Sequence, residues 1–283
     1  MIDQKGCFKQ EAFFRKGETS LVLRDLFHTV CGIMGQMRGK GNPHVKKKEK
    51  LEKPYVAAII PAAGSASRMG GIDKQFESLG NIPVLAMTML AFSYSDWIDE
   101  LVVVTRGKDI PLVLEMTRGF AVKKVRSVVA GGDTRQESVQ KGIEAVSSKT
   151  QYVAIHDGAR PLVSSQVIAD TILDAVRYGA AAAAVPVTDT IKIAKDRKIE
   201  STLDRSTLYA VQTPQVFELE SYLAAVQAAN EAGRDFTDDC QLMEFYGKPV
   251  YLSAGDYKNI KITTPTDLVI ARVLAGQEGL VWS

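Results

Sequence analysis

Short apolar runs and helical patterns alternate along most of the sequence, from Tyr55 to Gly276. The runs that we predict as strands cover residues 55–61, 99–105, 124–131, 152–157, 181–187 and 248–255. Helices are predicted between and after them, at residues 83–95, 111–120, 135–147, 164–179, 218–233 and 264–276. The strands are apolar along their whole length, as in a parallel sheet that is covered on both faces. The sequence therefore predicts a three-layer, Rossmann-like α/β fold with a mostly parallel sheet.

One stretch interrupts this alternation, between Thr188 and Phe217, where strand-like pieces follow one another without a long helix. We interpret it as an excursion from the core and predict a β-hairpin arm at about residues 188–210. The polar clusters of the chain, in contrast, directly follow the predicted strands. Because ligands of open α/β sheets bind at the carboxyl ends of the strands, we expect the functional site at that edge.

Charge is distributed unevenly along the chain. Residues 1–55 contain 12 Lys/Arg and 6 Asp/Glu, whereas the remainder contains 23 and 27, so the main body is mildly acidic. That balance argues against a nucleic-acid-binding body. No apolar stretch approaches the roughly 20 residues of a membrane span, and no secretory signal is recognisable. The three cysteines are widely spaced and indicate neither a disulfide framework nor a thiolate metal cluster. We expect a cytoplasmic protein with no membrane or nucleic-acid partner.

The chain divides into a basic extension at residues 1–54, a domain at 55–276 and a short tail at 277–283. Apolar periodicity at residues 19–37 predicts a short amphipathic helix, and a charged linker follows it. Three interpretations of the extension stay open. It is a partner-binding or membrane-surface segment, a disordered tail, or an artefact of a start upstream of Met34 or Met37.

The loop "PAAGSASRMGGIDKQ", residues 61–75, follows the first predicted strand. Its small residues let backbone amides approach a ligand, and amides at such a turn form an anion site. Arg68 and Lys74 add two cations that suit a polyphosphate. The loop is not a P-loop, since no Ser/Thr follows Lys74, and it lacks the G-x-G-x-x-G pattern. The residues alone predict binding of nucleotide phosphates, with a tightly packed turn as the structural alternative.

The segment "AGGDTRQESV", residues 130–139, follows the third predicted strand. Its two glycines let backbone groups face a flat base, and Ser138 offers a hydroxyl, so that the segment suits cytosine. Asp133 or Thr134 is expected to cap the following helix, which is compatible with base binding. Arg135 is expected to pair with a nearby carboxylate.

The segment "HDGARP", residues 156–161, ends the fourth predicted strand. Asp157 is a candidate ligand of magnesium or of a sugar hydroxyl, and Arg160 is expected to orient it through a salt bridge. We predict that His156 is a hydrogen-bonded core residue and not an acid–base catalyst. Lys261, in what we predict to be an apolar strand, is expected to point into the cleft instead of reaching out to water.

Together the segments "PAAGSASRMG", "DKQ", "GGDTRQESV", "HDGARP", "DTIK", "LDRSTLYAVQTPQVF", "TDD" and "NIKITTP" resemble the 2-C-methyl-D-erythritol 4-phosphate cytidylyltransferase family. The resemblance spans nearly all of residues 55–276, in the family's order. It departs at Ala66, where the family usually has a second loop glycine. The resemblance implies transfer of a cytidylyl group from CTP to methylerythritol phosphate, with magnesium or another divalent cation.

The resemblance also implies roles for individual residues. The CTP-binding residues would be Pro61, Ala62, Ala63, Gly64, Gly132, Asp133, Ser138, Asp157 and Gly158. The acceptor phosphate and polyol would be bound by Asp157, Arg160, Thr190, Arg205, Thr213, Thr237 and Lys261. The candidate catalytic residues are Arg68, Lys74, Arg205 and Lys261, and Asp157 is the candidate metal ligand. The arm would exchange across a homodimer, so that Thr190 and Arg205 complete the partner's site.

Three other functions stay open at this point. The nearest is a cytidylyltransferase for another polyol phosphate, such as ribitol 5-phosphate, because related families share these motifs. A sugar-1-phosphate nucleotidylyltransferase has a comparable first loop, but "DTIK" and "NIKITTP" speak against it. A nucleotide-binding module without activity is disfavoured because Arg68, Lys74, Arg205 and Lys261 are all present.

Overall fold

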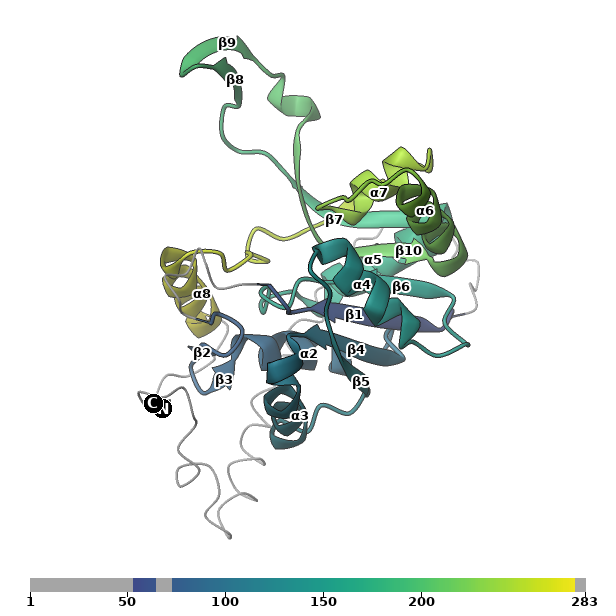
Figure 1. Cartoon of the computed structure of the whole chain (residues 1–283). Helices are drawn as coiled ribbons and strands as arrows, with labels where there is room; N and C mark the ends of the chain where they lie inside the picture. The colour runs from purple at the N-terminus through teal and green to yellow at the C-terminus, as the bar shows by residue number, and fades with distance from the viewer. Residues whose placement is uncertain (1–52, 65–72, 278–283) are drawn as a thin grey trace, which may run out of the picture.

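Figure 1 shows a computed structural model of the chain, which describes residues 53–64 and 73–277. Several predictions from the sequence therefore fall outside the described residues. These are the amphipathic helix of the extension, the loop positions Ala66 and Arg68, and the tail at residues 278–283.

A seven-stranded sheet forms the core, in the order β11-β7-β10-β6-β1-β4-β5. Its strands are β1 (Val56–Pro61), β4 (Glu100–Thr105), β5 (Val125–Ala130), β6 (Tyr152–Ile155), β7 (Ala180–Pro186), β10 (Tyr209–Glu218) and β11 (Tyr251–Ala254). Strand β1 pairs in parallel with β4 and β6, β4 with β5, and β7 with β11. Strand β10 is antiparallel to both of its neighbours. The prediction of a mostly parallel sheet is confirmed.

Helices cover both faces of this sheet. They are α2 (Val84–Tyr94), α3 (Ile110–Gly119), α4 (Arg135–Glu144), α5 (Ser165–Tyr178), α6 (Leu219–Glu231) and α7 (Asp239–Phe245), while α8 (Pro265–Gln277) packs outside these two layers. Helices α2, α3 and α5 pack on one face with Val56, Ala58 and Ile60 of β1. Helices α4, α6 and α7 pack on the other face, where Ile59 points. Two apolar layers thus enclose one sheet, which confirms the three-layer prediction.

The predicted excursion is shorter than residues 188–217. A two-stranded hairpin, β8 (Lys192–Lys195) and β9 (Lys198–Thr202), projects from the body with the short 3-10 helix η4 (Arg205–Thr207) beside it (Figure 1). Residues 209–217, which we expected in the excursion, instead belong to β10 in the middle of the sheet. A proline inside a strand-like run argues against a central strand. Here a bulge between Val211 and Gln215 accommodates Pro214.

A smaller apolar cluster lies where α8 meets the β2 (Ser78–Leu79) and β3 (Ile82–Pro83) ribbon. Leu268 and Ala271 of α8 pack there with Leu79 and Ile262. The segment before α8 is irregular, so the strand that we predicted around Lys261 is wrong. Its backbone does not extend the sheet; Ile262 N–H donates instead to the Ala159 carbonyl, 2.9 Å away.

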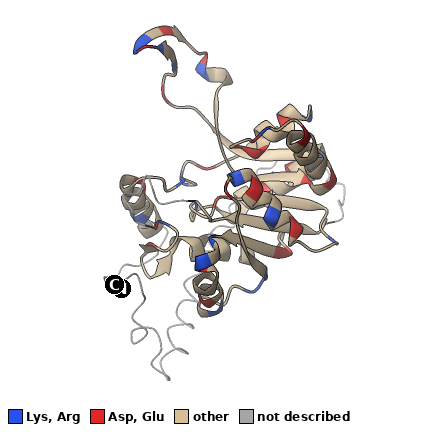
Figure 2. Cartoon of the chain, in the orientation of Figure 1, with Lys and Arg blue, Asp and Glu red and all other residues tan. Residues whose placement is uncertain are grey.

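Charged residues are spread over the elements of the chain. Figure 2 shows Lys and Arg interspersed with Asp and Glu on both the body and the projecting hairpin. Within residues 53–64 and 73–277, none of the helices combines the length and the apolar character that crossing a membrane would require.

Candidate active site

A polar pocket of about 120 Å³ lies at the carboxyl end of β6, beside the bulge of β10. Its lining residues are Arg135, Asp157, Arg160, Val211, Gln212, Thr213, Gln215, Thr237, Asp238 and Lys261. Five of these were predicted as acceptor-binding residues: Asp157, Arg160, Thr213, Thr237 and Lys261. They come from segments as much as 104 residues apart, and only the fold brings them together.

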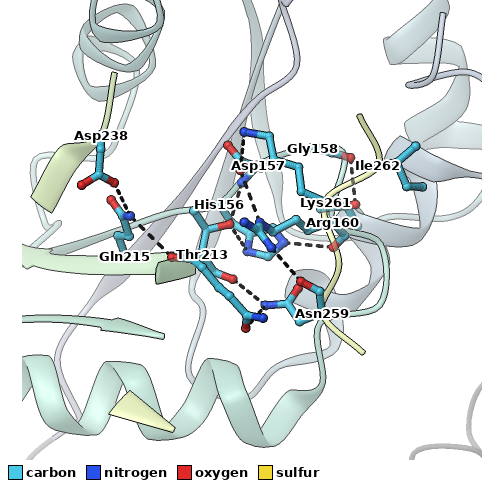
Figure 3. A network of polar contacts seen from close by, with 12 residues as sticks. His156, Asp157, Gly158, Arg160, Thr213, Gln215, Asp238, Asn259, Lys261 and Ile262 are labelled. Carbon is cyan, nitrogen blue, oxygen red and sulfur yellow. Dashed lines mark hydrogen bonds and ion pairs between the residues drawn. The ribbon is translucent and has the colours of Figure 1, made fainter. Parts of the chain in front are cut away.

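Asp157 is the centre of the charges in this pocket (Figure 3). Its Oδ2 lies 2.9 Å from Lys261 Nζ and 3.4 Å from Arg160 Nε. Its Oδ1 lies 4.0 Å from Arg135 Nε. The predicted salt bridge of Arg160 with Asp157 is confirmed, and Lys261 points into the pocket as expected. We name Asp157, Arg160, Arg135 and Lys261 the Asp157 cluster.

The cations of the cluster keep Asp157 ionised. Burial by itself raises the pKa of this carboxyl, but the charges of Lys261, Arg135 and Arg160 outweigh burial and hold the pKa well below its ordinary value. Burial lowers the pKa of Arg160, and Asp157 partly offsets that effect. Lys261 is the most exposed cation of the cluster, with 40% of its side chain exposed, and is therefore the one best placed to bind an anionic ligand.

Arg135 begins α4 and connects the cluster to a second buried acid. Its NH2 lies 2.6 Å from Asp239 Oδ2, and Tyr222 donates its hydroxyl to Asp239 Oδ1 at 2.7 Å. Asp239 and Tyr222 are both buried. The predicted pairing of Arg135 with a carboxylate is confirmed, and the guanidinium also lines the pocket.

His156 is fully buried behind the pocket, against the ring of Phe92, with ring centroids 4.7 Å apart. Its Nε2 lies 3.1 Å from the Arg160 carbonyl and its Nδ1 lies 3.1 Å from Thr213 Oγ1. Burial lowers the pKa of His156 to about 4, so the ring is neutral at pH 7. The prediction of a hydrogen-bonded core histidine agrees with these contacts.

The predicted CTP-binding segments meet beside this pocket. Gly158 N–H donates to the Pro61 carbonyl at 3.1 Å, which joins the turn after β6 to the end of β1. A Cβ on Gly131 would lie 2.7 Å from Ser138 Oγ and 2.8 Å from Ala63 Cβ. The loops after β1 and β5 therefore touch at Gly131, and only glycine permits that contact.

Thr134, and not Asp133, caps α4: its hydroxyl accepts from Glu137 N–H at 3.1 Å. Asp133 N–H donates to the Glu137 carboxylate at 2.7 Å. Ser138 Oγ accepts from Gly132 N–H at 3.1 Å and donates to the Thr134 carbonyl at 2.9 Å. One lone pair of Ser138 is left for a donor such as an exocyclic amine. Gly132, Asp133 and Ser138 thus form one ordered turn.

Lys74 connects the first loop to the segment that carries Lys261. Its Nζ donates to the Ile262 carbonyl at 2.8 Å. Ala62, in the described part of that loop, is buried, and its N–H donates to the Val104 carbonyl at 2.7 Å. Gly64 ends the described part of the loop. Lys74 and Lys261 therefore approach the site from adjoining segments.

Of the residues predicted to bind the acceptor, Thr190 and Arg205 are the two that do not line the pocket. Both are exposed, Thr190 before β8 and Arg205 in η4. Arg205 NH1 donates to the Thr188 carbonyl at 2.7 Å, within the base of the arm. Figure 1 shows the hairpin and η4 held away from the body.

The pocket offers a metal ion little by itself. Within the described ranges, no three His, Cys, Asp or Glu side chains gather as a metal site would require. Both oxygens of Asp157 already face cations, so phosphate oxygens and water would supply most of the ligands of a magnesium ion, with Asp157 as one carboxylate ligand beside them.

Sequence reasoning missed several residues of the pocket. Gln212, Gln215 and Asp238 line it, and buried Asn259 donates to the Thr213 carbonyl at 2.8 Å. The "QTPQ" and "NIK" segments had been noticed, but their contacts depend on the β10 bulge. A signal existed for Asp238: an Asp before an apolar run predicts a helix start, and its side chain caps α7.

Comparisons with known proteins agree with this geometry. The family model described as 2-C-methyl-D-erythritol 4-phosphate cytidylyltransferase matches residues 56–277. The protein of that name from Desulforamulus reducens is 46% identical over 220 residues, covering 77% of this chain and 94% of that protein. Its namesake from Caldanaerobacter subterraneus subsp. tengcongensis is also 46% identical, over 221 residues, covering 77% and 97%.

Solved structures agree as well. The 4-diphosphocytidyl-2C-methyl-D-erythritol synthase from Anaerococcus prevotii superposes with a TM-score of 0.72 at 30% identity, covering 79% of this chain and 97% of that chain. The 2-C-methyl-D-erythritol 4-phosphate cytidylyltransferase from Thermus thermophilus gives 0.66 at 34% identity, covering 78% and 99%. The chain belongs to the 2-C-methyl-D-erythritol 4-phosphate cytidylyltransferase family.

Proposed function

We propose that this chain transfers a cytidylyl group from CTP to 2-C-methyl-D-erythritol 4-phosphate and releases pyrophosphate. The observation that carries the proposal is the Asp157 cluster, next to the loops after β1 and β5: Lys261 and Arg160 pair with Asp157, and Arg135 lies between Asp157 and Asp239. A polyol phosphate brings both the anion that cations bind and the hydroxyls that Asp157 and Thr213 can accept from. Membership of the family supports the choice of substrates.

CTP would lie across the loops that meet at Gly131. The backbone of residues 61–64 faces the triphosphate, and Gly132, Asp133 and Ser138 face the cytidine, with the Ser138 lone pair accepting from the cytosine amine. Asp157 and Gly158 lie between the two halves, in the turn that is bonded to Pro61. Lys74 and Arg68 neutralise the charge that grows on the α-phosphate and on the leaving pyrophosphate.

The acceptor phosphate would attack the α-phosphorus of CTP in line with the departing pyrophosphate. Phosphate is mostly ionised at pH 7 because its second pKa is near 6, so it needs no general base. This agrees with the burial and the neutral state of His156. Lys261, Arg160 and Arg205 hold the acceptor, while Thr213 and Thr237 contact it from β10 and the start of α7. Positioning and electrostatics then supply most of the rate.

Magnesium or another divalent cation would be held by Asp157 and the CTP phosphates. When bound, it neutralises phosphate charge and makes the pyrophosphate a better leaving group. The chain itself supplies the carboxylate and the cations that surround it.

The arm would complete the site across a homodimer. Its apolar side chains Ile193 and Ile199 are 45% and 60% exposed, which is costly for a hairpin that packs on nothing. A symmetric dimer would cover them and bring Thr190 and Arg205 to the partner's pocket. We place the enzyme in the cytoplasm, with CTP and the polyol phosphate as its small-molecule partners.

Pyrophosphate release tests the reaction. The purified chain is incubated with CTP, magnesium and one acceptor at a time: methylerythritol phosphate, ribitol 5-phosphate and a sugar 1-phosphate. We expect turnover with the first and at least a hundredfold lower kcat/KM with the others. A higher kcat/KM with ribitol 5-phosphate would show that the chain is instead a cytidylyltransferase for that polyol phosphate. CTP binding without turnover of any acceptor would refute the proposal.

Subunit complementation tests the shared site. Lys261→Met and Arg205→Ala are prepared separately as proteins of low activity, then unfolded together and refolded as a mixture. A shared site predicts that each heterodimer regains one intact site, so that the mixture recovers about a quarter of the wild-type activity. A site built within one chain predicts no recovery. Each protein refolded alone is the control.

A further inference from the structure

Four polar groups behind the pocket form a series of three hydrogen bonds, and the Arg160 carbonyl at one end determines their direction. The Arg160 carbonyl can only accept, so the His156 Nε2 at 3.1 Å carries the proton and donates it. The ring has no exposed surface and neither nitrogen is bonded to a carboxylate, so it is uncharged, and its unprotonated Nδ1 accepts from the Thr213 hydroxyl at 3.1 Å. Thr213 Oγ1 in turn accepts from the Asp157 N–H at 3.1 Å. Figure 3 shows these groups side by side.

In this series of hydrogen bonds, the Thr213 hydroxyl donates its only proton to His156. A threonine hydroxyl has one donor and two acceptor lone pairs. The donor goes to His156, and one lone pair receives the Asp157 N–H. What Thr213 has left for a ligand is a single lone pair, and the residue lines the pocket.

We propose that His156 is a positioning residue that makes Thr213 a hydrogen-bond acceptor toward the bound polyol. Thr213 thereby recognises a hydroxyl of the acceptor substrate and not its phosphate, because ionised phosphate oxygens cannot donate. This inference rests on the proposed function, and it assigns a specificity role to a histidine that touches no substrate.

The surroundings of His156 hold this arrangement in place. His156 has no exposed surface and Thr213 is 4% exposed, so water cannot compete for either bond. The side-chain amide of Asn259 donates to the backbone carbonyl of Thr213 and holds that backbone in place. Arg160 NH1 in turn donates to the backbone carbonyl of Asn259 at 2.7 Å. The turn from Asp157 to Arg160 is thus held at its first N–H by Thr213 and at its last carbonyl by His156.

A double-mutant cycle in steady-state kinetics tests the proposal. Thr213→Val removes the hydroxyl at nearly constant shape, and we expect the KM for the polyol phosphate to rise about tenfold, with kcat and the KM for CTP changed much less. His156→Gln keeps a donor for the Arg160 carbonyl but has no acceptor at the Nδ1 position. We expect its KM for the polyol phosphate to rise about fivefold. The double variant should resemble Thr213→Val, because His156 acts through that hydroxyl.

Two further variants separate positioning from a packing role. His156→Asn places an amide near the Nδ1 position, so it should restore more of the polyol KM than His156→Gln although it loses the bond to Arg160. Thr213→Ser retains a hydroxyl and should recover most of the loss seen in Thr213→Val. Equal effects of Asn and Gln, or multiplication of the two single effects to about fiftyfold in the double variant, would overturn the proposal.

Substrate analogues identify the group that Thr213 reads. With monodeoxy forms of the polyol phosphate, the wild type should lose about tenfold in kcat/KM for one analogue in particular. The Thr213→Val enzyme should no longer distinguish that analogue from the parent. An enzyme that discriminates equally well after the substitution contradicts the assignment, whereas a wild type without turnover would count against the proposed function.

The tautomer is measured without any activity. The chain has only two other histidines, His28 and His44, so His156 is assigned in the nitrogen spectrum of a ¹⁵N-histidine-labelled sample by comparison with the His156→Gln variant. At pH 7 we expect a protonated Nε2 and an unprotonated Nδ1 whose resonance moves in Thr213→Val. A protonated Nδ1 would refute the inference independently of the kinetics.

Discussion

The Asp157 cluster and the β8–β9 arm both carry residues that we predict to bind the acceptor. Those of the cluster are packed into the body of the protein, whereas those of the arm are exposed. Asp157 and Arg160 are buried or nearly so and cross-linked by ion pairs at 2.9 to 3.4 Å with Lys261 and with each other. Every residue of β8 and β9 is exposed, and Arg205 donates locally, to the Thr188 carbonyl at the base of the arm. The difference agrees with the proposal above that one half of the site is preorganised within the chain and that a partner subunit completes the other half.

Holding charged side chains in a buried site lowers the stability of the fold unless those charges pair with one another. A buried ion is costly unless it is paired, so Asp157 and its cations depend on one another. Substitutions in the cluster should therefore affect both activity and folding. Substitutions in the arm should affect activity and assembly but leave the folding of the body unchanged.

Lys261→Met should give the largest effect. It removes the cation nearest to Asp157 and a charge that the acceptor phosphate needs, so we expect kcat/KM to fall about 10²- to 10³-fold in the pyrophosphate assay. Lys248→Met, at an exposed position outside the site, is the matched control and should behave like the wild type. A loss below tenfold for Lys261→Met would mean that the cluster does not hold the acceptor.

The pH dependence of stability should show the buried His156. Because its pKa is lowered from 6.5 to about 4, the unfolded state binds a proton first as the pH falls, and the free energy of unfolding decreases between pH 6.5 and 4. The contribution is on the order of 3 kcal/mol at pH 4 relative to pH 7. Denaturant titrations at several pH values should show a smaller decrease in His156→Gln. Identical pH profiles of the two proteins would contradict burial of a neutral ring.

Arg205→Ala tests the arm. In the proposed dimer Arg205 contacts the substrate of the partner's site, so its removal should lower kcat/KM about thirtyfold, as expected for the loss of a charge-assisted hydrogen bond to phosphate. Its thermal midpoint and its dimer mass in solution should match those of the wild type. If Arg205→Ala unfolded as easily as a cluster variant, the contrast between the two halves would fail.

Asp204→Ala should give the smallest effect. The Asp204 side chain accepts from the Ser206 N–H and hydroxyl at 3.0 and 2.8 Å and so orders η4, which carries Arg205. Removing this cap loosens a segment that the proposed dimer would order again, so we expect kcat/KM to fall by only about threefold. Asp204→Asn retains an acceptor, so its kcat/KM should fall less. If Asp204→Ala lost more kcat/KM than Arg205→Ala, Asp204 would have a direct role in the reaction.

The sequence predicted the layers of the fold but not its strand order. Apolar runs and helical periodicity located six of the seven sheet strands and the helices that cover them. The seventh, β10, carries Pro214 and runs antiparallel, and nothing local in its sequence places it between β6 and β7. Helix α7 was missed because seven residues give too little periodicity.

The site was partly predictable, because local sequence patterns reveal its charged residues but not the contacts between distant segments. Asp157 and Arg160 were predicted at the end of a strand and Lys261 within one; that last strand is wrong, but the three charges do line one pocket. The partner of Arg135, Asp239, lies 104 residues away, and a contact at such a separation leaves no local pattern. The contacts of Thr213 with His156 and Asp157 depend on the bulge in β10.

By itself, the sequence determined which segments bury apolar surface and which residues can bind anions, because both follow from side-chain chemistry and from spacing along the chain. Only the tertiary structure decided which charges share one pocket and in which direction the Thr213 hydroxyl points. Those properties arise from burial and from distances between segments far apart in sequence. Asp157 is kept ionised by three neighbours, and His156 is kept neutral by the exclusion of water.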